Sequence, residues 1–191
     1  MRKMIAALQM SLDGLAQGSD MGGPEWVDSW ADALALISEV DAFVQGAGMY
    51  PGYAQYWSAI EADPSATAPF SSRKPYEREV AYAQRAAVTP HYVLSRSLDR
   101  VEWPSTARIV RDLDALRALK AAPGKNIYVV GGPSLVVQLL NAALIDELYL
   151  IVAPLLLGGG KPMFAGSELK QLQLVRAEPA KHGRVILRYR A

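Results

Sequence analysis

The stretch from residue 126 to residue 154 limits the folds open to this chain more than any other feature. It reads NIYVVGGPSLVVQLLNAALIDELYLIVAP: an apolar strand-like run, two glycines and a proline, an apolar helix-like run, and a second apolar strand-like run. Strands that are apolar at nearly every position are typical of parallel sheets covered by helices on both faces. The stretch therefore predicts a strand–helix–strand unit of an α/β protein.

Strand and helix patterns alternate along the rest of the 191 residues. We expect strands at 4–10, 41–46, 91–95 and 107–110, and helices at 25–39, after Pro75 and after Asp112. Two closing runs, about 172–178 and 184–190, read as an antiparallel hairpin. The pattern predicts one domain, residues 1–191, with three α/β/α layers and a mixed, mainly parallel central sheet.

Composition excludes several classes of function. Twenty Lys and Arg balance nineteen Asp and Glu, and no block of like charge indicates a nucleic-acid partner. The chain has no Cys and two His, so we expect no metal site. No apolar run reaches the roughly 20 residues of a membrane span. We expect a cytoplasmic protein that acts on a small molecule.

The glycine pair at 131 and 132 lies where a strand leads into a helix. A helix that begins there offers unpaired N–H groups and a positive dipole end to an anion, and glycine has no Cβ to keep the anion away. Taken alone, the pair is explained more simply by a tight turn without a ligand. The chain has no G-x-G-x-x-G motif, and LLLGGGKP is not a Walker A loop, because Leu155 and Pro162 occupy two of its required positions.

Four segments together resemble one family. MIAALQMSLDG, VQGAGMY, YVLSRS and IYVVGGPSLVVQLLNAALIDELYLIVAPLLLGGGKPMF are similar, in order and spacing, to the dihydrofolate reductase-like family, which includes the reductase half of the riboflavin-pathway deaminase-reductase. The resemblance covers nearly the whole chain apart from residues 58–88. It implies a dihydrofolate reductase-like fold, an NADPH-dependent oxidoreductase and a homodimer built by the late strands.

The resemblance also implies which residues bind NADPH. The first strand and its SLDG turn would flank the nicotinamide, the segment after the second strand and the Gly-Gly turn would hold the pyrophosphate, and the Ser-Arg pair would meet the 2′-phosphate. The cofactor-binding residues are then Asp13, Gly14, Gly46, Ala47, Gly48, Met49, Leu94, Ser95, Arg96, Gly131, Gly132, Pro133, Ser134 and Leu135.

The chemistry of Ser95 and Arg96 suits that role. A guanidinium can donate two parallel hydrogen bonds to a phosphate, and a hydroxyl can donate to a further oxygen of the same group. Without the surrounding pattern, Arg96 would read as a solvated loop residue. The family usually carries Gly-Arg-x-Thr where this chain has GAGM, so Ala47 replaces an arginine and Met49 a hydroxyl. These departures indicate an altered affinity or preference for the cofactor.

The substrate end is less defined by the sequence. Riboflavin-pathway reductases carry a Glu where this chain has Val130, which argues against a ribitylated pyrimidine. For a proton donor the candidates are Asp28 and Asp32, and Asp32 is our nominee, although both read equally as part of a solvated helix face. By position, the apolar residues Ile5, Ala7, Val130 and Ile151 would line a site for a flat heterocycle.

Three classes of function remain open. The sequence favours a reductase that transfers hydride from NADPH to a pterin-like or pyrimidine-like heterocycle. A non-catalytic nucleotide-binding module that kept the fold would also explain Ala47 and Met49. A structural protein that uses the apolar run at 148–157 as an interface would need no cofactor.

Overall fold

The computed structural model describes residues 2–18, 30–37 and 39–191, and for residues 30–32 it describes the backbone alone. By their internal contacts the residues form two compact units. Unit 1 takes in residues 1–2 and 29–130, and unit 2 takes in residues 3–28 and 131–191. The single domain predicted over residues 1–191 stays a prediction. Of the predicted helix at 25–39, residues 25–29 and 38 lie outside the described part of the chain, and the described helix ends at Ala35, earlier than predicted.

Unit 1 holds four parallel strands, which pair in the order β5-β4-β3-β6. They are β3 (Val40–Gly46), β4 (His91–Leu94), β5 (Arg108–Val110) and β6 (Asn126–Val129). The last residues of β3, β4 and β5 are paired with one another, because Leu94 aligns with Gly46 on one side and with Val110 on the other. The carboxyl ends of these strands therefore share one edge.

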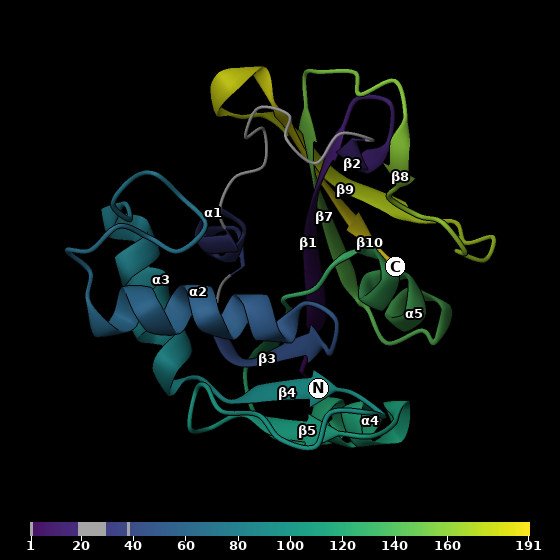
Figure 1. Ribbon diagram of the computed structural model, residues 1–191. Helices are drawn as coiled ribbons and strands as arrows, with labels where there is room; N and C mark the ends of the chain where they lie inside the picture. Colours follow the sequence, from purple (N-terminus) through teal and green to yellow (C-terminus); the bar gives the residue numbers. More distant parts are fainter. Residues whose placement is uncertain (1, 19–29, 38) are drawn as a thin grey trace. The chain divides into compact units, whose positions relative to one another are not determined.

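Four helices belong to unit 1: α1 (Trp30–Ala35), α2 (Tyr50–Ala62), α3 (Glu77–Val88) and α4 (Leu113–Ala121). Figure 1 shows α2 and α3 side by side, and the two helices pack against each other. The Pro-Gly sequence at 51–52 lies in the first turn of α2, where proline lacks only an amide that would have no helical partner. Asp112 caps α4 as predicted, since its carboxylate accepts from the Ala115 amide at 2.9 Å.

A chain of buried hydrogen bonds joins α2, α3 and β4. The Thr89 carbonyl can only accept, so the Nδ1 of His91, 2.7 Å away, carries the proton and donates it. The Nε2 of His91 then accepts from the Tyr53 hydroxyl at 3.1 Å, and Tyr53 accepts from the Tyr82 hydroxyl at 3.0 Å. These three side chains are buried, and Phe43 contacts His91 edge to face. Burial lowers the pKa of His91 to about 4, so the imidazole is neutral.

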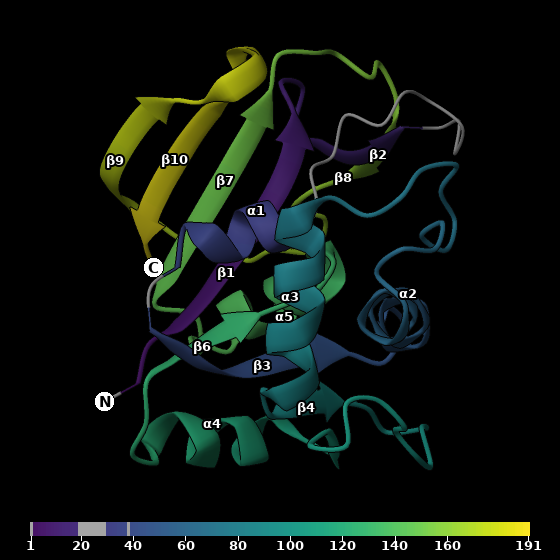
Figure 2. The ribbon, with the colours of Figure 1, turned by 90° about the vertical axis from the view of Figure 1, so that its left-hand side faces the viewer.

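Unit 2 holds four further strands in the order β1-β7-β10-β9, and Figure 2 shows them side by side. They are β1 (Met4–Ser11), β7 (Glu147–Ala153), β9 (Gln173–Pro179) and β10 (Val185–Arg190). The pair β1–β7 is parallel, and β10 pairs antiparallel with both β7 and β9. Each strand of the terminal hairpin begins one residue after the start of its predicted run. It also covers the edge of β7 within the same chain.

The remaining described elements of unit 2 are one helix, one 3-10 turn and two short strands. They are α5 (Pro133–Asn141), a 3-10 turn at Lys181–Gly183, and an antiparallel pair formed by β2 (Leu15–Gly18) and β8 (Gly160–Pro162). This small pair was not predicted. It joins the segment after the SLDG turn to the LLLGGGKP segment. A further hydrogen bond supports this contact, since the Met163 amide donates to the Gly14 carbonyl at 2.9 Å.

A buried carboxylate ties the strands of unit 2 together at the start of β7. Glu147 is 4% exposed and accepts hydrogen bonds from Lys3 at 2.7 Å and from Arg188 of β10 at 2.7 and 3.0 Å. Burial by itself raises the pKa of Glu147, but the two cations outweigh it and hold the pKa below its ordinary value. The carboxylate is therefore ionised and paired at neutral pH.

We expect His91 to make folding sensitive to mild acid. The unfolded chain binds a proton at His91 below a pKa of about 6.5, whereas the folded chain takes it up only near pH 4. Stability should therefore fall as the pH drops from about 6.5 to about 4, by roughly 3 kcal/mol for this residue alone. Urea unfolding followed by circular dichroism at several pH values measures the slope.

The variant His91→Gln should flatten that slope, because glutamine does not titrate. A matched control is His182→Asn, which removes an exposed histidine and should leave the slope unchanged. A direct NMR titration that found the pKa of His91 above 6 would contradict the prediction.

Candidate functional site

Two predicted cofactor segments of unit 1 lie side by side at the carboxyl edge of its strands. Gly46 pairs with Leu94 at the last position of β3 and β4, and the Ala47 amide donates to the Leu94 carbonyl at 3.2 Å. The segments Gly46–Met49 and Leu94–Arg96 are therefore neighbours, as the resemblance implies. The strand pairing brings them together although they lie about 50 residues apart in the sequence.

The turn after β4 is held by the side chain of its first residue. The Ser95 hydroxyl accepts from the amides of Ser97 and Leu98, at 3.2 and 2.9 Å, and the Ser95 amide donates to the Val110 carbonyl of β5 at 3.0 Å. Ser95 is 4% exposed. The hydroxyl keeps its own proton for a further acceptor, and none of the described residues takes it.

Two arginines accompany this turn. Arg96 is exposed, and among the described residues none bonds to its guanidinium. Arg111 follows β5 and donates from Nη1 to the Ser95 carbonyl at 3.2 Å and to the Leu98 carbonyl at 2.7 Å. The sequence analysis did not assign Arg111 to the site. A signal was present, because a residue that directly follows the short strand at 107–110 must reach the edge shared by the parallel strands.

The start of α2 shows what the GAGM sequence changes. Met49 is the N-cap residue of α2, and no side chain forms a capping hydrogen bond there. A threonine at an N-cap accepts from a free amide of the first turn, and methionine has no such acceptor. Ala47 offers only a methyl group. Within GAGM, an anion at this helix end would therefore meet backbone amides and no side-chain donor.

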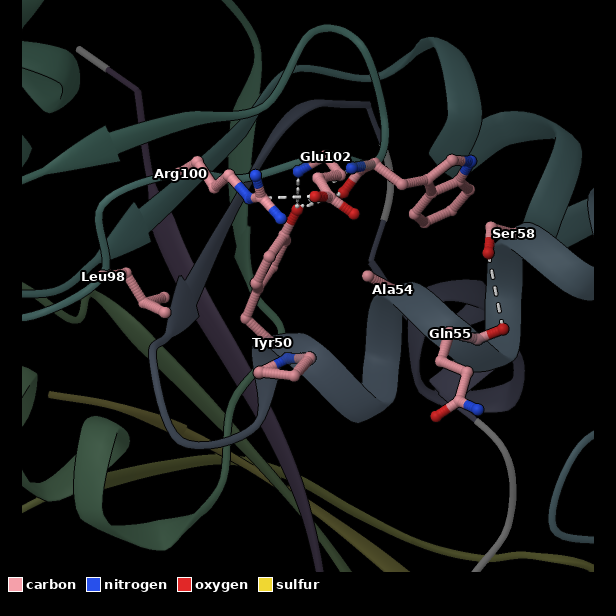
Figure 3. A pocket seen from close by; sticks show the side chains of 9 residues that line it. Tyr50, Ala54, Gln55, Ser58, Leu98, Arg100 and Glu102 are labelled. Atoms are coloured by element: carbon pink, nitrogen blue, oxygen red, sulfur yellow. Dashed lines mark hydrogen bonds and ion pairs between the residues drawn. The ribbon is translucent and has the colours of Figure 1, made fainter.

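A hollow of about 410 Å³ lies in unit 1 between α2 and the loop that follows the Ser95 turn. Figure 3 shows Ala54, Gln55 and Ser58 of α2 on one side and Arg100 and Glu102 on the other. The Tyr50 hydroxyl ties the loop to the helix: it donates to the Trp103 carbonyl at 2.8 Å and accepts from the Glu102 amide at 2.9 Å. None of the predicted cofactor residues lines this hollow.

Gly131 and Gly132, the glycine pair before α5, differ in their surroundings. Gly132 is the N-cap of α5, with φ −74° and ψ 174°, a conformation that any residue adopts. A Cβ at Gly132 would meet none of the described atoms within 4 Å, whereas a Cβ at Gly131 would lie 2.6 Å from Cδ2 of Leu135. Packing against Leu135 therefore accounts for Gly131. Neither packing nor backbone conformation accounts for Gly132, and the open space fits a ligand that approaches the helix end.

The rest of this turn suits an anion in the same way. Pro133 lies in the first turn of α5, and Ser134 beside it is exposed. Leu135 is 8% exposed and begins the apolar side of the helix. The amides of the first turn of α5 carry the positive end of the helix dipole.

The SLDG turn of unit 2 is fixed by Asp13. Its carboxylate accepts from the Ser11 hydroxyl at 2.5 Å and from the amides of Gly158 and Leu157 at 2.8 and 3.1 Å. The Ser11 hydroxyl, followed by these amides, lowers the pKa of Asp13 below its ordinary value. Gly14 has φ +77°, in the left-handed region that favours glycine, and its amide closes the turn onto the Ser11 carbonyl. Asp13 therefore shapes the loop as an ionised group.

Three of the four predicted substrate residues share one face of the β1–β7 pair. Ile5 and Ala7 are two residues apart on β1, and Ile151 of β7 aligns with Gln9 on the same face. All three side chains are buried. Val130, in unit 1, is fully buried, and its amide donates to the Val44 carbonyl at 2.8 Å. Asp28 lies outside the described residues, and Asp32 lies in α1, where only the backbone is described.

The residues present fit a nicotinamide dinucleotide phosphate on the grounds given above. Unit 1 offers a hydroxyl and a guanidinium that no described residue binds, beside paired strand ends, and unit 2 offers a helix end with open space at Gly132. No group of His, Asp and Glu among the described residues could hold a metal ion. In that part of the chain, no helix is long and apolar enough to cross a membrane.

Comparison with known proteins gives relatives and structural neighbours. The uncharacterised protein YyaP of Bacillus subtilis (strain 168) is 29% identical over 167 residues, which cover 85% of this chain and 80% of YyaP. A Shewanella sp. PV-4 protein described as a riboflavin biosynthesis protein superposes with a TM-score of 0.66 at 22% identity and covers 98% of both chains. Dihydrofolate reductase from Enterococcus faecalis, complexed with NADP(H), gives a TM-score of 0.60 at 13% identity over 98% of this chain and 95% of that one.

These structural likenesses confirm the dihydrofolate reductase-like fold, with its mixed and mainly parallel strands. The model of the family described as the RibD C-terminal domain matches residues 2–186. The match runs through all the segments that carry the resemblance in the sequence. The chain therefore belongs to the RibD C-terminal domain family.

Proposed function

We propose that the protein is an NADPH-dependent reductase that transfers hydride to a small conjugated heterocycle of the pterin or pyrimidine type. The observation that carries the proposal is the paired edge of β3 and β4, where Ser95 and the free guanidinium of Arg96 follow the last strand residues. Membership in a family of reductase domains supports it. When bound, the cofactor would supply the hydride, and the chain would supply binding and alignment.

Each unit carries groups that suit a part of the cofactor. In unit 1, Ser95 and Arg96 would hold the 2′-phosphate, and the amides at the start of α2 would face the phosphates. In unit 2, the amides at Gly132 and the first turn of α5 would take the pyrophosphate. Ile5, Ala7 and Ile151 would offer apolar side chains to the flat ring from a face that Gln9 shares, which suits a conjugated heterocycle and does not restrict it to one compound.

The direct test is NADPH oxidation at 340 nm with a panel of dihydropterins, pterins, aminopyrimidines and quinones. Turnover with at least one heterocycle is expected. Tight NADPH binding without turnover on any member would instead support the second candidate, a non-catalytic nucleotide-binding module. The uncapped start of α2 at Met49, and Ala47 beside it, favour that candidate. We place the protein in the cytoplasm as part of the same proposal.

We predict that the wild type binds NADPH more tightly than NADH and that Arg96→Ala removes most of the difference. Loss of one charge-assisted phosphate contact should weaken NADPH about 10-fold or more and leave NADH nearly unchanged. Quenching of tryptophan fluorescence measures both affinities. Arg100→Ala is the control, because Arg100 is an exposed arginine of the next loop whose partner is Glu102. Equal wild-type affinity for the two cofactors would contradict the prediction.

A second prediction concerns Gly132. Valine fits the backbone conformation and the open space at this position, so Gly132→Val should fold with little loss of stability. Its branched side chain would fill the space at the end of α5, and cofactor binding should fall at least 10-fold, to an extent set by the amides it blocks. Ala121→Val adds a branched side chain at an exposed position at the end of α4, outside the predicted cofactor segments, and serves as the control. A folded Gly132→Val protein with unchanged NADPH affinity would mean that the turn binds no anion.

We also propose a homodimer. The edge of β7 is covered by β10, so the surface left for a second copy is the hairpin, where Leu174, Val175 and Val185 are 40–52% exposed. A long edge strand with exposed apolar side chains favours pairing. Light scattering should give twice the chain mass of 20.7 kDa. Leu174→Lys together with Val175→Lys should shift the protein to a folded monomer, and a wild-type monomer at all concentrations would rule the dimer out.

A further inference from the structure

We propose that Arg111 supplies a second positive charge to the 2′-phosphate subsite and thereby helps to set the preference for NADPH. The inference rests on the proposed function. It assigns a role to a residue that the sequence patterns left without one.

The strand ends of unit 1 place Arg111 next to Ser95. The last residues of β3, β4 and β5 are aligned side by side, and the residues that directly follow them are Ala47, Ser95 and Arg111. Neighbouring strands lie about 4.8 Å apart, so positions 47 and 111 flank Ser95 from opposite sides at similar distances. An arginine is expected at position 47 from the family pattern, and this chain has a methyl group there. The guanidinium stands on the other side of Ser95 instead.

The hydrogen bonds of Arg111 hold its guanidinium in one orientation. Both protons of Nη1 are used on the carbonyls of Ser95 and Leu98, which lie in the same turn. No described residue accepts from Nε or Nη2, so the opposite edge of the guanidinium keeps three N–H groups. Arg96 has no such anchor. Of the two arginines, Arg111 therefore loses less conformational entropy when an anion binds.

The same contacts couple Arg111 to Ser95. The Ser95 hydroxyl accepts from two amides of the turn that Arg111 braces, so its remaining proton points in a fixed direction. A phosphate beside this turn would receive one hydroxyl donor, the free edge of Arg111 and the exposed guanidinium of Arg96. A phosphate that carries close to two negative charges is well matched by two arginines.

The test uses the full chain and two small probes, adenosine 2′,5′-bisphosphate and adenosine 5′-monophosphate, which differ only by the 2′-phosphate. Isothermal titration gives the ratio of their affinities for the wild type, Arg111→Gln, Arg111→Lys and Arg108→Gln. Arg108 is an exposed arginine at the start of β5 that stacks on Tyr92, so its variant removes the same charge at the far end of the strand. Circular dichroism and thermal melting check that each variant folds.

We expect Arg111→Gln to bind the bisphosphate about 10-fold more weakly and the monophosphate within about 2-fold of the wild type. The affinity of Arg111→Lys for the bisphosphate should lie between those of the wild type and Arg111→Gln, because lysine keeps the charge but cannot donate two parallel hydrogen bonds. Arg108→Gln should match the wild type. A wild-type preference for the bisphosphate that survives in Arg111→Gln would overturn the inference and leave the proposed function standing. An equal loss of affinity for both probes in Arg111→Gln would also overturn the inference, since Arg111 would then serve only to hold the shape of the turn. A wild type without preference would overturn the proposed cofactor preference and this inference together.

Discussion

The parallel pairing of β3, β4 and β5 is the constraint on which the candidate site of unit 1 depends. Parallel strands end at the same edge, and the register places Gly46, Leu94 and Val110 in one row there. Three segments that are distant in sequence then begin their loops next to one another. A shift of one strand by a single residue would separate Ser95 from Arg111 and turn the following side chains to the other face. The site therefore depends on backbone hydrogen bonds before it depends on any side chain.

The glycine pair shows why a motif alone does not identify a binding site. The two residues are adjacent and chemically identical, yet Leu135 restricts one and leaves the other in open space. A sequence cannot separate the two reasons, because the atom that restricts Gly131 belongs to the helix that follows. The open position is the better candidate for a ligand contact, since no contact among the described residues requires a glycine there.

Much of the fold could be predicted from the sequence, because apolar residues recur along its strands and helices with clear periodicity. The terminal hairpin and the Asp112 cap are confirmed, as are the family and the fold class. The sequence patterns did not predict the helix at 50–62, because a Pro-Gly pair is typical of a turn and the structure uses Pro51 and Gly52 in the first turn of a helix. The pair β2–β8 was missed, since two short segments with no alternating pattern carry no signal of their own. Arg111 was missed for a different reason: the lateral order of strands decides its neighbours, and sequence periodicity does not contain that order.

Asp13 and Ser95 are polar residues near strand ends whose side chains shape turns. Asp13 is ionised and Ser95 is neutral, so the two differ in what they can bind. Asp13 accepts one hydroxyl and two amides, and these bonds keep it ionised. A carboxylate in that state repels phosphate, so under the proposed function Asp13 would act through the shape of its loop and would make no direct phosphate contact. Ser95 also accepts two amides, but it is neutral and retains a proton to donate. Of the two residues, only Ser95 can both form its turn and donate a hydrogen bond to an anion.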